Sequence, residues 1–190
     1  MIYLDTNVIV SLLAEDSSSR AAEQWWSAQS VPLAVSPWVT AEFYSHIGLR
    51  CRKHEFTSRQ ASAYVDKFDE VVATHLTLLK STDAALLRAS AWLRSAGCSM
   101  QTADALHLAI ALENEAAAIA TFDARFAKCI EKLRIAGLKV IALPAAGTRH
   151  QLQKKRADYN VTERDIAKAV KWARKRKTAE RENAQRLTVR

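Results

Sequence analysis

The chain has 190 residues, 49% of them hydrophobic, which fits one folded domain with an appendage and excludes disorder throughout. No segment approaches the ~18 apolar residues of a membrane span, and no basic segment followed by an apolar run indicates export. The three cysteines are widely spaced and lack a metal-binding pattern, as expected for reduced thiols. We therefore expect a soluble, cytoplasmic protein that does not bind a membrane.

The net charge of +8 is concentrated at the C-terminal end of the sequence. Residues 148–190 contain 14 basic residues (Lys and Arg) and 5 acidic residues (Asp and Glu). Residues 1–147 contain 14 basic and 15 acidic residues. The excess of positive charge therefore lies in a tail, and the rest of the chain is close to neutral. We predict one domain over residues 1–144 and a basic helical tail over residues 145–190, with a hinge after Pro144.

Short apolar runs alternate with helical patterns along the predicted domain. We expect strands over residues 2–4, 33–35, 118–122 and 139–143. We expect helices over residues 8–14, 37–52, 57–79, 82–96 and 103–117, and a further helix that contains Phe126. Glycines at 97 and 137 are expected to end the helices that precede them. Short apolar strands interleaved with helices predict an α/β fold with a parallel sheet covered on both faces.

Four acidic residues from distant parts of this pattern are expected to meet. Asp5 ends the first strand, and Asp123 ends the third. Glu42 lies about one and a half turns into the helix that leaves the second strand. Asp104 lies in the first turn of the helix over residues 103–117, which is apolar on nearly every side and is therefore expected to be buried. Since ligands bind outside the carboxyl ends of parallel strands, we expect all four carboxylates in one crevice at that edge.

Such a cluster favours a cation. Two carboxylates ~5 Å apart repel by about 3 kcal/mol at an effective dielectric constant of 20. Hard divalent cations with oxygen ligands remove this repulsion, and Mg²⁺ bridges carboxylates and phosphates while it keeps several waters. A divalent cation also lowers the pKa of bound water, which suits phosphodiester hydrolysis.

Each acidic residue also has an ordinary structural explanation. Asp5 fits a turn or a helix cap, and Asp123 fits a cap of the helix that contains Phe126. Asp104 would favour the N-terminal end of its own helix, and Glu42 would suit a solvated helix face. Four such coincidences at one edge of the sheet are less plausible than one shared site.

The same residues lie in motifs that resemble those of PIN domains. Residues 2–8 (IYLDTNV) resemble the opening motif of that family, and residues 40–43 (TAEF) resemble its second acidic motif. Residues 104–111 (DALHLAIA) are similar to the third motif, and residues 120–123 (ATFD), with Phe126, to the fourth. The resemblance covers about residues 1–144, and the subgroup it favours is the VapC toxins of bacterial toxin–antitoxin pairs.

The resemblance implies an α/β/α sandwich and an endoribonuclease that depends on Mg²⁺ or Mn²⁺ and cleaves structured RNA. It also implies a homodimer and inhibition by a cognate VapB-type antitoxin. Carried over to this sequence, it assigns catalysis and metal binding to four residues and the orientation of carboxylates or water to three others. The acidic set is Asp5, Glu42, Asp104 and Asp123, and the orienting set is Thr6, Asn7 and Thr121.

Two other functions remain open. The first is a catalytically inactive PIN fold that binds RNA or a protein, which the intact acidic set argues against. The second is a phosphatase that forms an aspartyl phosphate, a class that usually has Asp where this chain has Asn7. His107 follows Asp104 by one turn, but its neighbours Leu106 and Leu108 favour a packed or dimer-facing histidine over a catalytic one.

The basic tail contains a further helical pattern. Thr162 and Asp165 have the spacing of a capping box, and an apolar face follows with basic residues around it. RNA recruitment, docking on the domain and insertion of a basic side chain among the carboxylates are all compatible with this pattern. Under the first interpretation, the candidate RNA-binding residues are Lys168, Lys171, Arg174 and Lys175.

Overall fold

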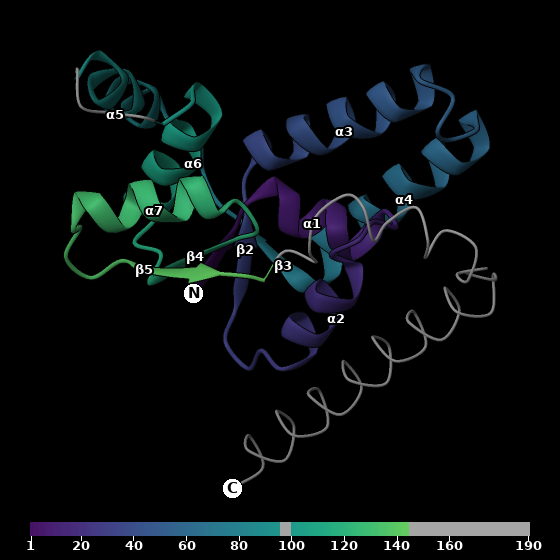
Figure 1. Cartoon of the computed structure of the whole chain (residues 1–190), viewed down its shortest axis with the longest axis horizontal. Helices are drawn as coiled ribbons and strands as arrows, with labels where there is room; N and C mark the ends of the chain where they lie inside the picture. Colours follow the sequence, from purple (N-terminus) through teal and green to yellow (C-terminus); the bar gives the residue numbers. More distant parts are fainter. Residues whose placement is uncertain (96–99, 145–190) are drawn as a thin grey trace, which may run out of the picture. The chain divides into compact units, whose positions relative to one another are not determined.

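The structure, a computed structural model, describes residues 1–95 and 100–144 (Figure 1). Within these ranges it contains one sheet of five parallel strands in the order β3-β2-β1-β4-β5. The strands are β1 (Ile2–Leu4), β2 (Leu33–Val35), β3 (Leu76–Leu78), β4 (Ala118–Thr121) and β5 (Lys139–Ala142). The buried residues of β1, β2 and β4 form the centre of the sheet.

Two groups of helices accompany the sheet. Helices α1 to α4 pack against one another, α5 packs on α6, and α7 packs on β4 and β5, as the right and left sides of Figure 1 show. The helices are α1 (Thr6–Leu13), α2 (Ser19–Ser27), α3 (Pro37–Arg52), α4 (Ser58–His75), α5 (Asp83–Arg94), α6 (Thr102–Glu113) and α7 (Ala124–Leu133). The predicted α/β/α sandwich with a parallel sheet is confirmed. Among the described residues, no helix is both long and apolar enough to cross a membrane.

Strands β1 and β4 bring distant residues together at the carboxyl edge of the sheet. Leu4 of β1 lies opposite Ala120 of β4, and the backbone amide of Asp5 donates to the Ala120 carbonyl at 3.0 Å. Asp5 and Thr121 therefore leave neighbouring strands side by side. The chain then turns directly into α1 after β1, and into α7 shortly after β4.

Helix α6 is buried on nearly every side, as its sequence predicts. All residues from Ala105 to Ala111 are buried, and they include His107. The helix ends at Glu113 rather than near residue 117, because Asn114 caps it and Glu115 adopts a left-handed φ of 52°. The short turn that follows leads directly into β4.

Several predicted boundaries are wrong. The stretch predicted as one helix over residues 57–79 is divided into α4 and the edge strand β3, whose leucines continue the apolar pattern of the helix. Helix α2 is an addition that the sequence analysis did not predict. Helix α7 ends at Leu133 because Arg134 is left-handed, whereas Gly137, with a φ of 81°, serves the later turn into β5. Gly97 and the predicted basic helical tail lie outside the described residues.

Candidate active site

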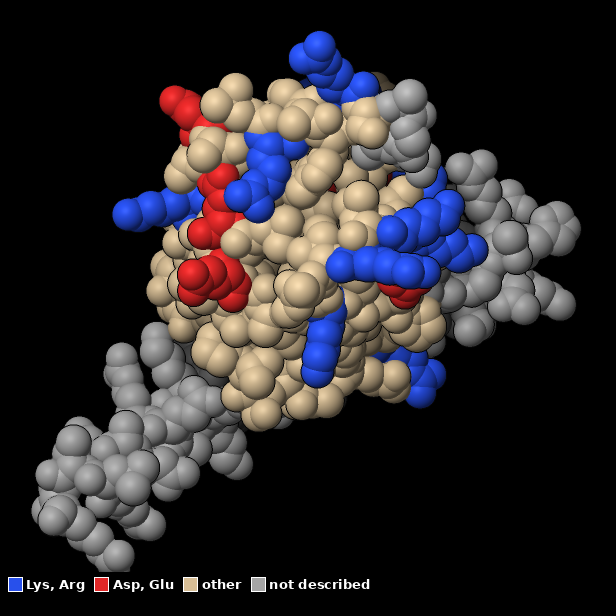
Figure 2. Space-filling view, turned by 90° about the vertical axis from the view of Figure 1, so that its left-hand side faces the viewer, with Lys and Arg blue, Asp and Glu red and all other residues tan. Residues whose placement is uncertain are grey.

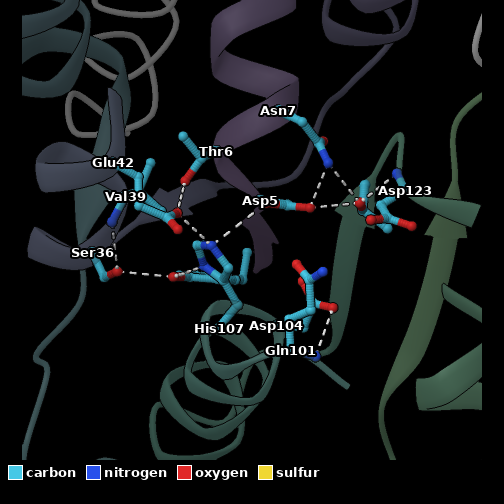
Figure 3. A network of polar contacts seen from close by, with 12 residues as sticks. Asp5, Thr6, Asn7, Ser36, Val39, Glu42, Gln101, Asp104, His107 and Asp123 are labelled. Atoms are coloured by element: carbon cyan, nitrogen blue, oxygen red, sulfur yellow. Dashed lines mark hydrogen bonds and ion pairs between the residues drawn. The ribbon is translucent and has the colours of Figure 1, made fainter. Parts of the chain in front are cut away.

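All four predicted carboxylates lie at the carboxyl edge of the sheet, next to the starts of helices. Asp5 and Asp123 occupy the N-cap positions of α1 and α7, and Asp104 lies in the first turn of α6. Glu42 comes from the second turn of α3. Figure 3 shows Asp5 between Glu42 and Asp123, with Asp104 and His107 reaching toward it from α6. The partial positive charge at helix N-termini favours carboxylates at these positions.

Asp5 is buried and held by two polar neighbours. Its Oδ2 accepts hydrogen bonds from Asn7 Nδ2 at 2.6 Å and from Thr121 Oγ1 at 2.6 Å. Asn7 is itself fixed, because its Oδ1 accepts from the backbone amide of Phe122 at 3.0 Å. The Asp5 side chain makes no capping bond to α1. Its ordinary structural explanation therefore does not account for its orientation.

Glu42 is held by Thr6 and His107. Glu42 Oε2 accepts a hydrogen bond from Thr6 Oγ1 and a second one, at 2.7 Å, from His107 Nε2. The same imidazole nitrogen lies 3.5 Å from Asp5 Oδ1. His107 is packed, as its sequence context favours, with 2% of its surface exposed. It nevertheless links the first two carboxylates, a role that the sequence analysis did not assign to it.

A buried chain of polar groups supports the other side of the His107 ring. His107 Nδ1 lies 3.0 Å from the Tyr3 hydroxyl, which lies 2.8 Å from Ser36 Oγ. Ser36 Oγ in turn accepts from the backbone amide of Val39 at 3.4 Å, at the start of α3. Burial raises the pKa of Tyr3, so its hydroxyl stays neutral and can donate. The ring is thus fixed from both edges.

The surroundings of His107 and Glu42 favour the charged form of each side chain. Burial acts to lower the pKa of His107, but its hydrogen bond to Glu42 and the charges of Asp5, Glu42 and Asp104 raise the pKa overall. Burial acts to raise the pKa of Glu42, but the hydrogen bond and charge of His107 and the hydrogen bond from Thr6 lower it overall. The acidic site therefore stabilises the proton on His107, which lies on its buried side.

Asp104 and Asp123 are held differently, by backbone amides and an arginine. Asp104 Oδ2 accepts from the backbone amide of Gln101 at 3.3 Å and from Arg125 Nη2 at 3.1 Å. Asp123 Oδ1 caps α7 by accepting from the backbone amides of Arg125 and Phe126 at 2.8 and 3.0 Å. Burial, together with the charges of Asp123 and Asp5, raises the pKa of Asp104 although Gln101 and Arg125 act to lower it.

The four carboxylates share one pattern of hydrogen bonding. Within residues 1–95 and 100–144, hydrogen bonds reach only one oxygen of each. The other oxygen remains a possible ligand, and carboxylate oxygens suit a hard divalent cation. Across the same ranges, no three Asp, Glu, His or Cys side chains are close enough to hold one ion as they stand. The donor chemistry therefore fits a divalent metal, but the side chains must draw together to bind it.

Two residues that support the site had weak signals in the sequence, and a third had none. His107 follows Asp104 by three residues and thus shares its helix face. Arg125 follows Asp123 by two residues, close enough for its long side chain to fold back. Tyr3 precedes Asp5 by two residues on the same strand face, but nothing in its apolar surroundings indicates a polar partner. The tail candidates Lys168, Lys171, Arg174 and Lys175 lie outside the described residues.

Comparisons with known structures support the fold. One similar structure is VapC20 of Mycobacterium tuberculosis, a sarcin–ricin loop cleaving toxin, with a TM-score of 0.56 and 22% sequence identity. The match covers 67% of this chain and 94% of the VapC20 chain. VapBC-1 of nontypeable Haemophilus influenzae has a TM-score of 0.51 at 20% identity, with 75% and 98% covered. VapBC2 of Rickettsia felis, bound to a promoter DNA fragment, has a TM-score of 0.50 at 20% identity, with 76% and 100% covered.

At the level of sequence, no curated protein matches the chain. The PIN domain profile, in contrast, matches residues 2–132, which include all four carboxylates and most of the described residues. The resemblance stated from the motifs is thereby confirmed. The chain belongs to the PIN domain family.

Proposed function

We propose that this chain is a metal-dependent endoribonuclease and the toxin of a type II toxin–antitoxin pair. The observation that carries the proposal is the arrangement of Asp5, Glu42, Asp104 and Asp123 at one edge of the sheet, where hydrogen bonds among the described residues reach only one oxygen of each. Packing alone gives no reason to gather four carboxylates, since like charges at one edge of a sheet repel one another. The similar fold of the VapC toxins supports the assignment of the biological role.

Under this proposal, Asp5, Glu42, Asp104 and Asp123 would hold Mg²⁺ or Mn²⁺. When bound, the cation supplies Lewis acidity and activates water for attack on a phosphodiester. Asn7 and Thr121 keep Asp5 oriented for this purpose. Thr6 and His107 do the same for Glu42. Such outer contacts fix the direction of a ligand oxygen, and their loss weakens metal sites by about 10- to 100-fold.

Single-turnover cleavage of RNA by the full-length protein tests the proposal. We expect cleavage with Mg²⁺ or Mn²⁺ and no cleavage with chelator. The cleavage rate should fall by more than about 100-fold in Asp5→Asn, Asp104→Asn and Asp123→Asn, because each change removes a proposed metal ligand. Circular dichroism of the variants controls for folding. RNA binding without metal-dependent cleavage would favour the inactive PIN-fold binding module instead, and near-wild-type rates in all three variants would overturn the assigned site.

The proposed partners are RNA, a VapB-type antitoxin and a second copy of the chain. The antitoxin is supported by the VapBC complexes among the similar structures. The RNA would be met in the cytoplasm. Co-expression with an antitoxin encoded next to this chain should give a stable complex that no longer cleaves RNA. Sedimentation of the toxin alone should report a dimer; a monomer at all concentrations would rule out the homodimer.

We propose that the basic tail binds the phosphate backbone of RNA. The surface in Figure 2 shows Lys and Arg beside Asp and Glu rather than one continuous basic area. Residues 1–147 carry 14 basic and 15 acidic residues, so the excess positive charge comes from the tail. Deletion of residues 148–190 should weaken RNA binding and make it less dependent on salt. Faster cleavage after deletion would indicate instead that the tail inhibits the site.

A further inference from the structure

The guanidinium of Arg125 lies against two of the four carboxylates. Its Nη2 is 3.1 Å from Asp104 Oδ2 and 3.8 Å from Asp123 Oδ2. The position follows from the local structure, because Asp123 caps α7 and Arg125 is the second residue of that helix. The arginine side chain can therefore turn back toward the first turn of α6.

Arg125 faces an oxygen that the proposed metal would need. Oδ2 of Asp123 is the oxygen that does not cap α7, whereas Oδ1 accepts the two backbone amides. A guanidinium and a divalent cation are both attracted to this oxygen and to Asp104. They cannot occupy the same space between the two carboxylates, so binding of one opposes binding of the other.

The side chain of Arg125 is able to leave. It is 48% exposed, compared with 14% for Asp104, so nearly half of its surface is already in contact with solvent. A half-exposed ion pair of this kind contributes little to the free energy of folding, so replacing the guanidinium by a divalent cation costs little free energy. No such freedom exists on the opposite side of the site, where His107 is almost fully buried.

We propose that Arg125 is a counter-ion that holds metal-free Asp104 and Asp123 together and competes with the divalent cation for them. The inference rests on the proposed function, because it takes these two carboxylates as metal ligands. Its consequence is a metal affinity below what the carboxylates alone would give. Metal entry then requires the guanidinium to move away from Asp104.

Lys128 provides a matched control. It lies one turn further along α7, is exposed, and forms no ion pair with either carboxylate among the described residues. Replacing Lys128 by Ala removes the same charge from the same helix. Any general effect of positive charge on metal binding therefore appears in Lys128→Ala, whereas direct competition appears only when Arg125 is changed.

The test is titration of the full-length protein with Mn²⁺, with free Mn²⁺ measured by electron paramagnetic resonance. We expect Arg125→Ala to bind Mn²⁺ about three- to tenfold more tightly than the wild type, and Lys128→Ala to stay within about twofold. Arg125→Gln, which keeps most of the side chain, should follow Arg125→Ala and controls for a folding defect.

The inference is overturned if the Arg125 variants bind Mn²⁺ no more tightly than Lys128→Ala. Weaker binding in the Arg125 variants would also overturn it, since Arg125 would then organise the site rather than compete for it. If the wild type binds Mn²⁺ but the variants do not differ, the proposed function stands and only this inference fails. If no protein binds Mn²⁺ at millimolar concentrations, both fail.

Discussion

The two sides of the candidate active site are built in different ways. The histidine side, Asp5 and Glu42 with His107, is held by the buried hydroxyl and imidazole groups of Thr6, Thr121 and His107 and by the half-buried amide of Asn7. The arginine side, Asp104 and Asp123 with Arg125, is held by backbone amides at helix starts and by an exposed guanidinium. The charged partners differ most: 2% of the His107 side chain is exposed, against 48% of that of Arg125.

This difference predicts which side is rigid. Removing a partner from a buried, hydrogen-bonded ion pair leaves an uncompensated charge and is strongly destabilising. Removing a partner from an exposed pair changes little, because water replaces it. The histidine side should therefore be fixed before metal binds, whereas the arginine side can adjust to draw the carboxylates around an ion.

The largest expected effect is on folding stability. His107→Leu leaves Glu42 and Tyr3 without their buried partner, and we expect it to lower the free energy of unfolding by about 3 kcal/mol. Arg125→Ala should lower it by less than about 1 kcal/mol. Urea denaturation in the presence of chelator measures both. Equal losses in the two variants would break the distinction between a rigid and an adjustable side.

The next effect is on catalysis through an orienting group. Thr121→Val removes the hydroxyl that donates to Asp5 Oδ2 while it keeps the shape of the buried side chain. We expect RNA cleavage to fall by about 10- to 100-fold, as for other groups that orient metal ligands. Thr82→Val, which removes the cap of α5 outside the site, is the control for a general loss of hydroxyl bonding. Undiminished RNA cleavage by Thr121→Val would contradict the proposal that the Thr121 hydroxyl orients Asp5 for catalysis.

Metal should stabilise the wild type by mass action. At ten times its dissociation constant, Mg²⁺ adds about 1.4 kcal/mol, equivalent to about 3–6 °C in the melting midpoint of a domain of this size. Asp104→Asn should lose this increase. With chelator it should melt above the wild type, because burial and the charges of Asp123 and Asp5 disfavour a charge on Asp104. A wild-type midpoint that does not respond to millimolar Mg²⁺ would exclude a cation site.

The smallest expected effect is on the pH dependence of stability in the metal-free protein. The pKa of His107 is raised above its ordinary value of 6.5. Its contribution to stability is therefore complete below pH 6.5 and is lost as the pH rises through the folded pKa. Melting midpoints from pH 6 to about 8 should consequently fall less in His107→Gln than in the wild type. Arg125→Gln should follow the wild type, since a guanidinium does not titrate there.

The acidic residues could be predicted because their positions follow from simple rules. Asp5 and Asp123 come directly after apolar strand runs, and the carboxyl ends of parallel strands meet at one edge. Asp104 and Glu42 follow from helix starts that Pro37 and the buried pattern of α6 indicate. These are local signals, and the parallel topology converts them into a common site.

The contacts between side chains could not be predicted in the same way. His107 lies in an apolar run, so its sequence context indicates packing but not its bonds to Glu42 and Tyr3, which come from elements far away in the chain. The edge strand β3 escaped prediction because three residues after a long helix are too short to show a period of two. Tertiary contacts decided both features.

The most direct test of a metal-dependent site is a crystal structure of the full-length protein grown with Mn²⁺, with anomalous scattering used to locate the ion. We expect a Mn²⁺ peak about 2.1 Å from an Asp5 oxygen and from an oxygen of Asp104 or Asp123. Arg125 should have moved away from Asp104, and His107 should still contact Glu42. The absence of a peak among these carboxylates in crystals that contain millimolar Mn²⁺ would contradict the account.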